Sequence, residues 1–289
     1  MTGTTDAAST PGTTPGTTPG TTPGTTPGTP GTPPTPGAAG VALVTGAAGL
    51  IGRDVATRLA RDGYAVAVNC PPGPEHETAA AAVVADITAR GGRAVVVPGD
   101  VSDPEQTTAM AARTRAELGP VTSLVCNAAV SVAARRDWRA HSAADWAEVL
   151  AVNVTGAYLC ARAVHPDLVA SGRGSVVVMA SVTPLLGRTG NLPYVTSKAA
   201  LIGLTRALAR EVGPDGVRVN ALAPGAIRGE AEAVYGDPGE LERTMAALQS
   251  LPRRGEASDV ASATAWLLGP DSGFVTGQLL VIDGGWVMH

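Results

Sequence analysis

Short apolar runs rich in valine alternate along the chain with longer alanine-rich stretches in which apolar residues recur at helical spacing. The apolar runs predict seven strands, over residues 41–45, 65–69, 94–97, 123–126, 175–180, 217–222 and 279–282. The stretches between them predict helices over residues 51–62, 76–90, 104–118, 142–170, 194–212 and 258–268. Strands that are apolar throughout and alternate with helices are typical of a parallel sheet covered on both faces. We therefore predict an α/β fold of Rossmann type, with a doubly wound, mostly parallel, seven-stranded sheet.

Residues 1–37 lack this pattern, because they are almost wholly Thr, Pro, Gly and Ala, with a repeating Pro-Gly-Thr-Thr unit. Such a segment has too few large apolar side chains to pack a core. We predict a disordered extension over 1–37 and a single domain over 38–289. The extension is either a tether to a partner or dispensable, and we favour the second interpretation.

Composition narrows the class of protein. The chain carries 25 acidic and 21 basic side chains, a net charge of −4, which argues against nucleic-acid or membrane-surface binding. No apolar run is expected to span a bilayer, and the start of the chain has no secretory signal pattern. The three cysteines are widely spaced and show no metal-ligand spacing, so we predict no metal site and a cytoplasmic location.

The first predicted strand runs directly into the sequence Thr-Gly-Ala-Ala-Gly-Leu-Ile-Gly, residues 45–52. Gly46, Gly49 and Gly52 allow a tight turn, and the helix that follows directs its first amides at a bound pyrophosphate. A glycine triplet alone is a weak signal, but its position after the first strand strengthens it. We expect Gly46, Gly49, Leu50 and Ile51 to contact a dinucleotide.

Polar side chains follow later strands of the same sheet. Asp100-Val101 comes after the third strand, and Asn127-Ala128 comes after the fourth. Because sheets of this kind bind ligands beyond the carboxyl ends of their strands, these residues are expected to line one cleft.

With these motifs in order, the sequence resembles the short-chain dehydrogenase/reductase family over residues 40–286. The resemblance continues through Asn153, Ser181, Tyr194-Val-Thr-Ser-Lys198, Pro224-Gly225-Ala226-Ile227 and the segment 276–285. It is closest to the compact single-domain branch, and within that to 3-oxoacyl carrier-protein reductases and polyketide ketoreductases. It implies that Asp100 contacts the adenine and that the Asn127 turn supports the cleft. It also places further cofactor contacts at Val101, Ala128, Tyr194, Lys198, Pro224, Gly225 and Ile227.

Three positions depart from the family pattern. Leu50 stands where the compact branch usually has Gly, and the resulting glycine spacing is that of the longer sugar-nucleotide branch. Ala129 replaces the Gly of an Asn-Ala-Gly turn, and Gly229 stands where a Thr often holds the nicotinamide amide.

The second strand ends at Asn69-Cys70, where no acidic residue is available to bind the ribose hydroxyls of NAD. We therefore favour NADP over NAD, with Asn69 at the ribose. Arg53 is the arginine nearest to the glycine turn in sequence.

Tyr194 and Lys198 are four residues apart on a predicted helix and therefore share one face. A nearby ammonium favours the phenolate, so the phenol can exchange a proton with a carbonyl or alcohol oxygen. The resemblance implies that Lys198 also binds the nicotinamide ribose, that Ser181 holds the substrate oxygen, and that Asn153 anchors a water linking Lys198 to solvent.

We interpret the chain as an NAD(P)H-dependent oxidoreductase that reduces a ketone, of 3-oxoacyl or polyketide-like type, to an alcohol. A redox-neutral sugar-nucleotide epimerase or dehydratase and a non-catalytic scaffold are the alternatives. Arg135, Arg136 and Arg139 form either a solvated loop or a docking site for an acidic carrier protein. The resemblance also implies a homo-oligomer, a tetramer or a dimer, paired through helices 142–170 and 194–212.

Deletion of residues 1–37 tests the domain boundary. Because the extension offers no core contacts, the melting temperature of the shortened chain should stay within about 2 °C of the full chain, with activity unchanged. Differential scanning calorimetry of the two chains measures this. A drop of several degrees would show instead that the extension docks on the domain.

Overall fold

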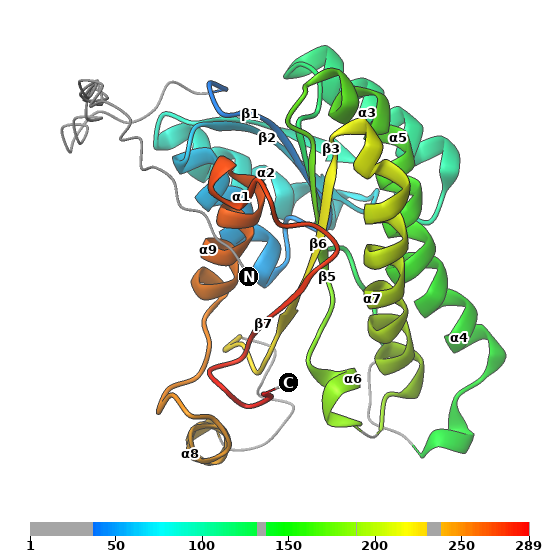
Figure 1. The fold of residues 1–289 in the computed structure, drawn as a ribbon, viewed down its shortest axis with the longest axis vertical. Helices are drawn as coiled ribbons and strands as arrows, with labels where there is room; N and C mark the ends of the chain where they lie inside the picture. The colour runs from blue at the N-terminus through cyan, green and yellow to red at the C-terminus, as the bar shows by residue number, and fades with distance from the viewer. Residues whose placement is uncertain (1–36, 132–136, 189, 230–237, 289) are drawn as a thin grey trace, which may run out of the picture. The chain divides into compact units, whose positions relative to one another are not determined.

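The computed structural model describes residues 37–131, 137–188, 190–229 and 238–288. Seven strands form one sheet, in the order β3-β2-β1-β4-β5-β6-β7, and every neighbouring pair is parallel. The predicted Rossmann-type sheet is therefore confirmed (Figure 1). The strands are β1 (Gly40–Val44), β2 (Tyr64–Cys70), β3 (Arg93–Pro98), β4 (Ser123–Cys126), β5 (Ser175–Met179), β6 (Arg218–Pro224) and β7 (Leu279–Ile282).

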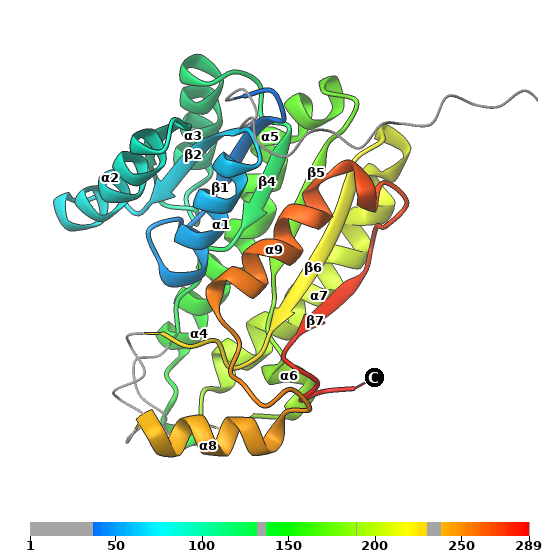
Figure 2. The same ribbon diagram turned by 90° about the vertical axis from the view of Figure 1, so that its left-hand side faces the viewer.

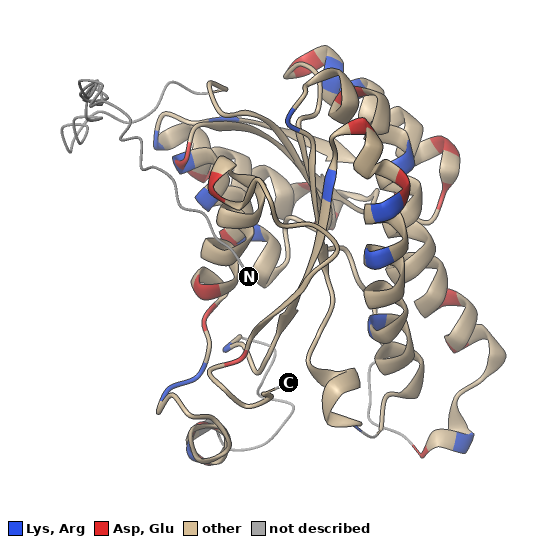
Figure 3. Cartoon of the chain, viewed as in Figure 1, with Lys and Arg blue, Asp and Glu red and all other residues tan. Residues whose placement is uncertain are grey.

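Helices cover both faces of the sheet, as Figures 1 and 2 show. One face is covered by α1 (Leu50–Arg61), α2 (Pro74–Ala89) and α9 (Ala257–Leu268). The other is covered by α3 (Pro104–Glu117), α5 (Gly156–Ala170) and α7 (Leu192–Val212). Acidic and basic residues both occur on the outer helices in the view of Figure 3.

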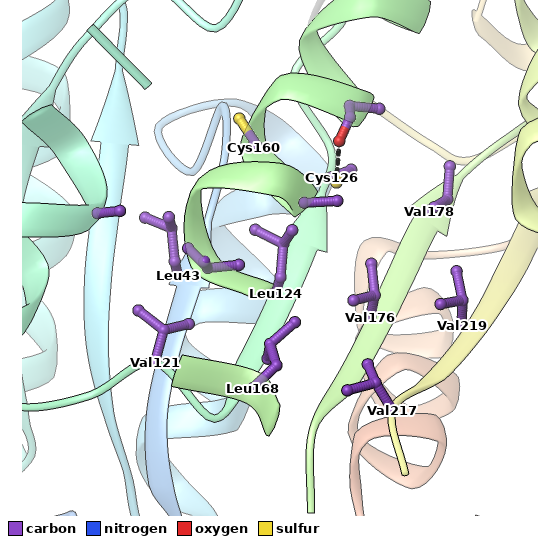
Figure 4. Close-up of a cluster of buried hydrophobic side chains, with 14 of the residues drawn as sticks. Leu43, Val121, Leu124, Cys126, Cys160, Leu168, Val176, Val178, Val217 and Val219 are labelled. Carbon is purple, nitrogen blue, oxygen red and sulfur yellow. Dashed lines mark hydrogen bonds between the residues drawn. The ribbon is translucent and has the colours of Figure 1, made fainter. Parts of the chain in front are cut away.

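The core consists of two layers because successive strand residues point to opposite faces. Leu43 and Leu124 are paired across β1 and β4, and both join the layer beneath α3, α5 and α7 (Figure 4). Their neighbours Val44 and Val125 are also paired, and they join the layer beneath α1, α2 and α9. The continuous apolar runs in the sequence follow from this burial on both faces.

The helix predicted over 142–170 is continuous but not uniform. It comprises α4 (Ala143–Leu150), a π-helical segment (Ala151–Thr155) and α5, which contains Pro166. The span Ala143–Ala170 is 28 residues long and contains an 18-residue window with a mean hydropathy of 1.2, enough to cross a membrane by length and composition alone. Contrary to our expectation, then, one segment passes that test. Its apolar side chains, such as Cys160 and Leu168, pack on the sheet, which accounts for the composition.

Within the described residues, two α-helices were not predicted, α6 (Thr183–Leu186) and α8 (Pro238–Leu248). The first is a single turn. The second buries Met245 but leaves Leu248 half exposed, and it lies in the polar, glycine-containing stretch 228–256. Residues 1–36 lie outside the described residues, and the predicted extension therefore stays a prediction.

Candidate active site and cofactor cleft

A cleft of about 830 Å³ lies at the carboxyl ends of the strands, a size in the range of small-molecule and cofactor sites. It brings together residues from the ends of β1, β2, β3, β4, β5 and β6. The predicted site residues that line it are Gly46, Gly49, Leu50, Ile51, Asn69, Asp100, Val101, Asn127, Ala128, Ser181, Tyr194, Lys198, Pro224, Gly225 and Ile227. Asn153 is the predicted site residue that does not line it.

The turn after β1 is packed too tightly for side chains. Gly46 has a φ of +60°, and a Cβ atom there would lie 2.9 Å from the Cα atom of Ala128. A Cβ atom at Gly52 would lie 2.4 Å from the carbonyl oxygen of Gly46. The two glycines therefore let the first turn of α1 and the segment after β4 approach the same stretch of backbone.

A buried polar network fixes this turn. The Oγ1 atom of Thr45 accepts hydrogen bonds from the backbone amides of Asn127 and Ala128, at 2.9 and 3.0 Å. In return, the Nδ2 atom of Asn127 donates to the carbonyl oxygens of Thr45 and Gly46, at 3.0 and 3.1 Å. The glycine turn is thus tied to the end of β4 by four hydrogen bonds.

Asn69 joins the same network from β2. Its Oδ1 atom accepts from the amide of Gly46 at 3.2 Å, and its Nδ2 atom donates to the carbonyl oxygens of Val97 and Gly99, at 3.1 and 3.0 Å. The side chain is 1% exposed. We expected it at the cofactor ribose, but its polar atoms already bind the backbones of two other segments. A direct contact with the ribose stays a prediction.

The first turn of α1 differs from the helices that follow β2 and β3. It has no acidic residue and no side-chain cap. By contrast, α2 begins with Glu75 and Glu77, and the side chain of Asp103 accepts from the first amides of α3. Since a helix N-terminus carries partial positive charge, α1 keeps its amides and this charge for an anionic ligand. Arg53 is exposed and does not line the cleft.

The predicted catalytic pair, Tyr194 and Lys198, lies on α7. The side chain of Lys198 is buried, and its Nζ atom donates to the carbonyl oxygen of Met179 at 2.6 Å. The same atom lies 5.5 Å from the centre of the Tyr194 ring. Burial lowers the pKa of Lys198 to about 8. Ser181, just beyond β5, is also buried, and its Oγ atom accepts from the amide of Thr183 at 3.1 Å.

Asn153 occupies the π-helical segment, a feature frequent at functional sites. Its Nδ2 atom donates to the Oγ atom of Ser197 at 2.9 Å and to the carbonyl oxygen of Val130 at 3.0 Å. Its Oδ1 atom accepts from the amide of Val130 at 2.8 Å, and Ser197 in turn donates to the carbonyl oxygen of Tyr194 at 2.7 Å. The side chain therefore connects the segment after β4 to the turn that carries Tyr194 and Lys198. A water held by Asn153 stays a prediction.

Sequence reasoning missed Thr45 and Ser197, because both are small hydroxyl residues whose roles depend on partners distant in sequence. Each could have been suspected from its position, one directly before the glycine turn and the other directly before Lys198. His76, an exposed residue in the first turn of α2, also lines the cleft.

The basic cluster is only partly described. Arg135 and Arg136 lie outside the described residues. Arg139 is exposed and forms an ion pair with Asp137, with an Nε–Oδ1 distance of 2.8 Å. Docking of an acidic carrier at this cluster stays a prediction.

Comparison with known proteins agrees with this geometry. A family model described as enoyl-(acyl carrier protein) reductase matches residues 46–287. A 3-oxoacyl-[acyl-carrier-protein] reductase of Staphylococcus aureus is 34% identical over 85% of this chain and 97% of its own length. The nodulation protein G of Azospirillum brasilense is 36% identical over 84% of this chain and 96% of its own.

Solved structures give the same result. A protein of Sinorhizobium meliloti described as a short-chain alcohol dehydrogenase superposes with a TM-score of 0.79, at 32% identity, over 85% of this chain and 95% of that one. A blue fluorescent protein from a metagenomic library, solved in complex with NADPH, gives a TM-score of 0.76 at 34% identity, over 86% and 98% of the two chains. The protein belongs to the short-chain dehydrogenase/reductase family. It is an oxidoreductase of the NAD(P)-dependent class.

The residues present fit a nicotinamide dinucleotide. A Cβ atom added at Gly46 or Gly52 would collide with neighbouring backbone, so glycine keeps this turn compact, and the first turn of α1 has neither acid nor cap. These are the features that a diphosphate requires. The Gly46 turn and α1 would hold the diphosphate, and Asp100 lies at the end of the cleft formed by β2 and β3.

The burial of Lys198 makes a testable prediction about pH. Its pKa of about 8 in the folded protein lies below the ordinary value of 10.5, so folding releases its proton between those values. The stability of the free protein should therefore rise through this group as the pH increases from about 8 to about 10.5. The variant Lys198→Met should lack this rise and be at least as stable as the wild type at pH 7, because it removes a desolvated charge.

Urea unfolding of both proteins at pH 7, 8.5 and 10 provides the measurement. The difference between the two proteins isolates Lys198 from other groups that titrate in this range. A variant that is clearly less stable at pH 7, or that keeps the full rise, would contradict the prediction.

Proposed function

We propose that the protein reduces the ketone of a 3-oxoacyl thioester to a secondary alcohol with NADPH. The observation that carries the proposal is a buried ammonium, that of Lys198, placed beside the Tyr194 ring in a cleft that also contains Ser181. Burying this charge costs free energy, so a catalytic use explains its position better than a structural one.

In this proposal the hydroxyls of Ser181 and Tyr194 bind the substrate carbonyl oxygen. The bound nicotinamide supplies the hydride that adds to the carbonyl carbon. Tyr194 donates its phenolic proton to the oxygen as negative charge develops there. Lys198 stabilises the phenolate that remains and binds the ribose of the cofactor.

Asn153 and Ser197 position this pair rather than react. They hold the backbone of Tyr194 against the segment after β4. A shift of this turn would move the phenol away from the substrate carbonyl. Acid–base catalysis is sensitive to that distance.

The substrate class is supported by the names of two relatives. One is the 3-oxoacyl-[acyl-carrier-protein] reductase above. The other, from Thauera aromatica and 35% identical, is a subunit of a hydroxy(phenyl)methylsuccinyl-CoA dehydrogenase. Both names specify an acyl chain on a carrier with an oxygen function to be reduced or oxidised. A scaffold role is less well supported, because Ser181, Tyr194 and Lys198 are all present in the cleft.

We also propose a cytoplasmic homo-oligomer. Cys70, Cys126 and Cys160 are free and buried, which suits a reducing compartment. On the outer side of α5, Tyr158 and Val169 are exposed apolar residues that a second copy could cover.

Replacement of Tyr194 by Phe tests the catalytic role. The variant should fold and bind NADPH as the wild type does, but turnover of acetoacetyl-CoA should fall about 10²- to 10⁴-fold, because the acid is lost. Stopped-flow absorbance at the NADPH band measures the rate. Wild-type turnover by the variant would show that Tyr194 is not the acid.

Crotonyl-CoA serves as a second substrate, since the matching family model is described as an enoyl reductase. A wild type that prefers crotonyl-CoA to acetoacetyl-CoA would show that the substrate is an enoyl thioester and not a 3-oxoacyl thioester.

The cofactor preference gives a further test. No carboxylate stands at the end of β2 to repel the 2′-phosphate of NADPH, which favours this cofactor. Arg53 does not line the cleft and so does not bind that phosphate there, and we therefore expect NADPH to be preferred only about tenfold, or ~1.4 kcal/mol. Burial and, to a smaller extent, the negative charge of Glu77 raise the pKa of Cys70. The charge of Glu77 therefore acts at this end of the cleft, where it also limits the preference for a 2′-phosphate. Cys70→Asp should reverse the preference. Asn69→Asp is unsuitable, since Asn69 holds the glycine turn.

The ratio of kcat/KM for NADPH and NADH in the wild type and in Cys70→Asp decides the matter. Equal values, or a preference of the wild type for NADH, would contradict the proposal.

A further inference from the structure

Two residues 179 positions apart in the sequence, Leu50 and Gly229, meet beside the cofactor cleft, which Leu50 lines. A Cβ atom built on Gly229 would lie 2.7 Å from the Cδ2 atom of Leu50 and 3.9 Å from its Cγ atom. One methyl group of Leu50 therefore occupies the space in which a side chain at position 229 would begin. These are also two of the three positions at which the sequence departs from its family pattern.

The contact joins the two walls of the cleft. Leu50 is the first residue of α1 and lines the cleft beside Gly49 and Ile51. Gly229 follows Ile227, which lines the opposite wall beyond β6. The contact therefore lies where the first turn of α1 faces the segment after β6.

The need for glycine at position 229 comes from Leu50 and not from the backbone. Gly229 is absent from the glycines with positive φ, so an L-residue can adopt its conformation. Leu50, for its part, is 47% exposed and belongs to neither core layer. The contact thus contributes little to the core, and its consequence is confined to the cleft.

We propose that Leu50 is a positioning residue for the nicotinamide dinucleotide and that Gly229 supplies the space its side chain needs. A side chain at position 229 would turn the flexible end of Leu50 away from its present place. One direction open to it is the cleft, where it would compete with the dinucleotide. The proposal rests on the cofactor class given above and adds to it a coupling between the two walls of the cleft.

Three variants test this coupling: Gly229→Ala, Leu50→Ala and the double variant. The readout is the dissociation constant of NADPH, measured by fluorescence titration without substrate, together with the melting temperature of the free protein. Gly229→Ala should weaken NADPH binding roughly tenfold, or ~1.4 kcal/mol, with almost no change in melting temperature. In the Leu50→Ala background, which lacks the Cγ and Cδ2 atoms, the same change should have less than a twofold effect, because coupled residues are not additive.

Gly203→Ala is the matched control. Gly203 is exposed on α7, and a Cβ atom there meets nothing within 4 Å, so NADPH binding should be unchanged. The proposal is overturned if Gly229→Ala weakens binding equally in both backgrounds, or in neither. A wild type that binds neither NADPH nor NADH would overturn the proposed function as well, which separates the two failures.

Discussion

The cofactor cleft depends on the close approach of two backbones, the glycine turn after β1 and the segment after β4. At their nearest point, a single Cβ atom on Gly46 would collide with Ala128. The amide and hydroxyl groups of Asn127, Thr45 and Asn69 replace the hydrogen bonds that a regular ladder would otherwise make there. Because this network also fixes the direction in which α1 leaves the sheet, it determines where a diphosphate can bind.

The same segment after β4 links the cofactor end of the cleft to its chemical end. Asn153 binds both backbone groups of Val130, and through Ser197 it reaches the turn that carries Tyr194. A displacement of this segment would therefore disturb both the glycine turn and the turn that carries Tyr194. This hydrogen-bond network stabilises the folded protein, whereas the burial of Lys198 lowers the stability of the free protein. The site thus combines a well-satisfied polar network with one desolvated charge, a combination typical of catalysis rather than of structure.

Much of this could be predicted from the sequence, because its signals are local. Strands buried on both faces produce continuous apolar runs, and all seven were found with ends within two residues of those predicted. Contacts between segments distant in sequence could not be predicted. Asn69 was predicted at the ribose, and its hydrogen bonds to the carbonyl groups of Val97 and Gly99 were not foreseen, because the sequence does not reveal the register between β2 and β3.

The effect of a departure from a family pattern also depends on contacts between residues distant in sequence, which the sequence alone does not reveal. Considered separately, Leu50 adds bulk to a turn that normally has none, and Gly229 removes a side chain that normally binds the nicotinamide. Each alone suggests a weakened cofactor site. In the structure the two changes meet, and the bulk of one fills the space vacated by the other. Packing constrains the sum of the volumes at a contact more tightly than the identity of either residue. A substitution at a binding site therefore has to be judged together with the residue it faces, even when that residue lies at the other end of the domain.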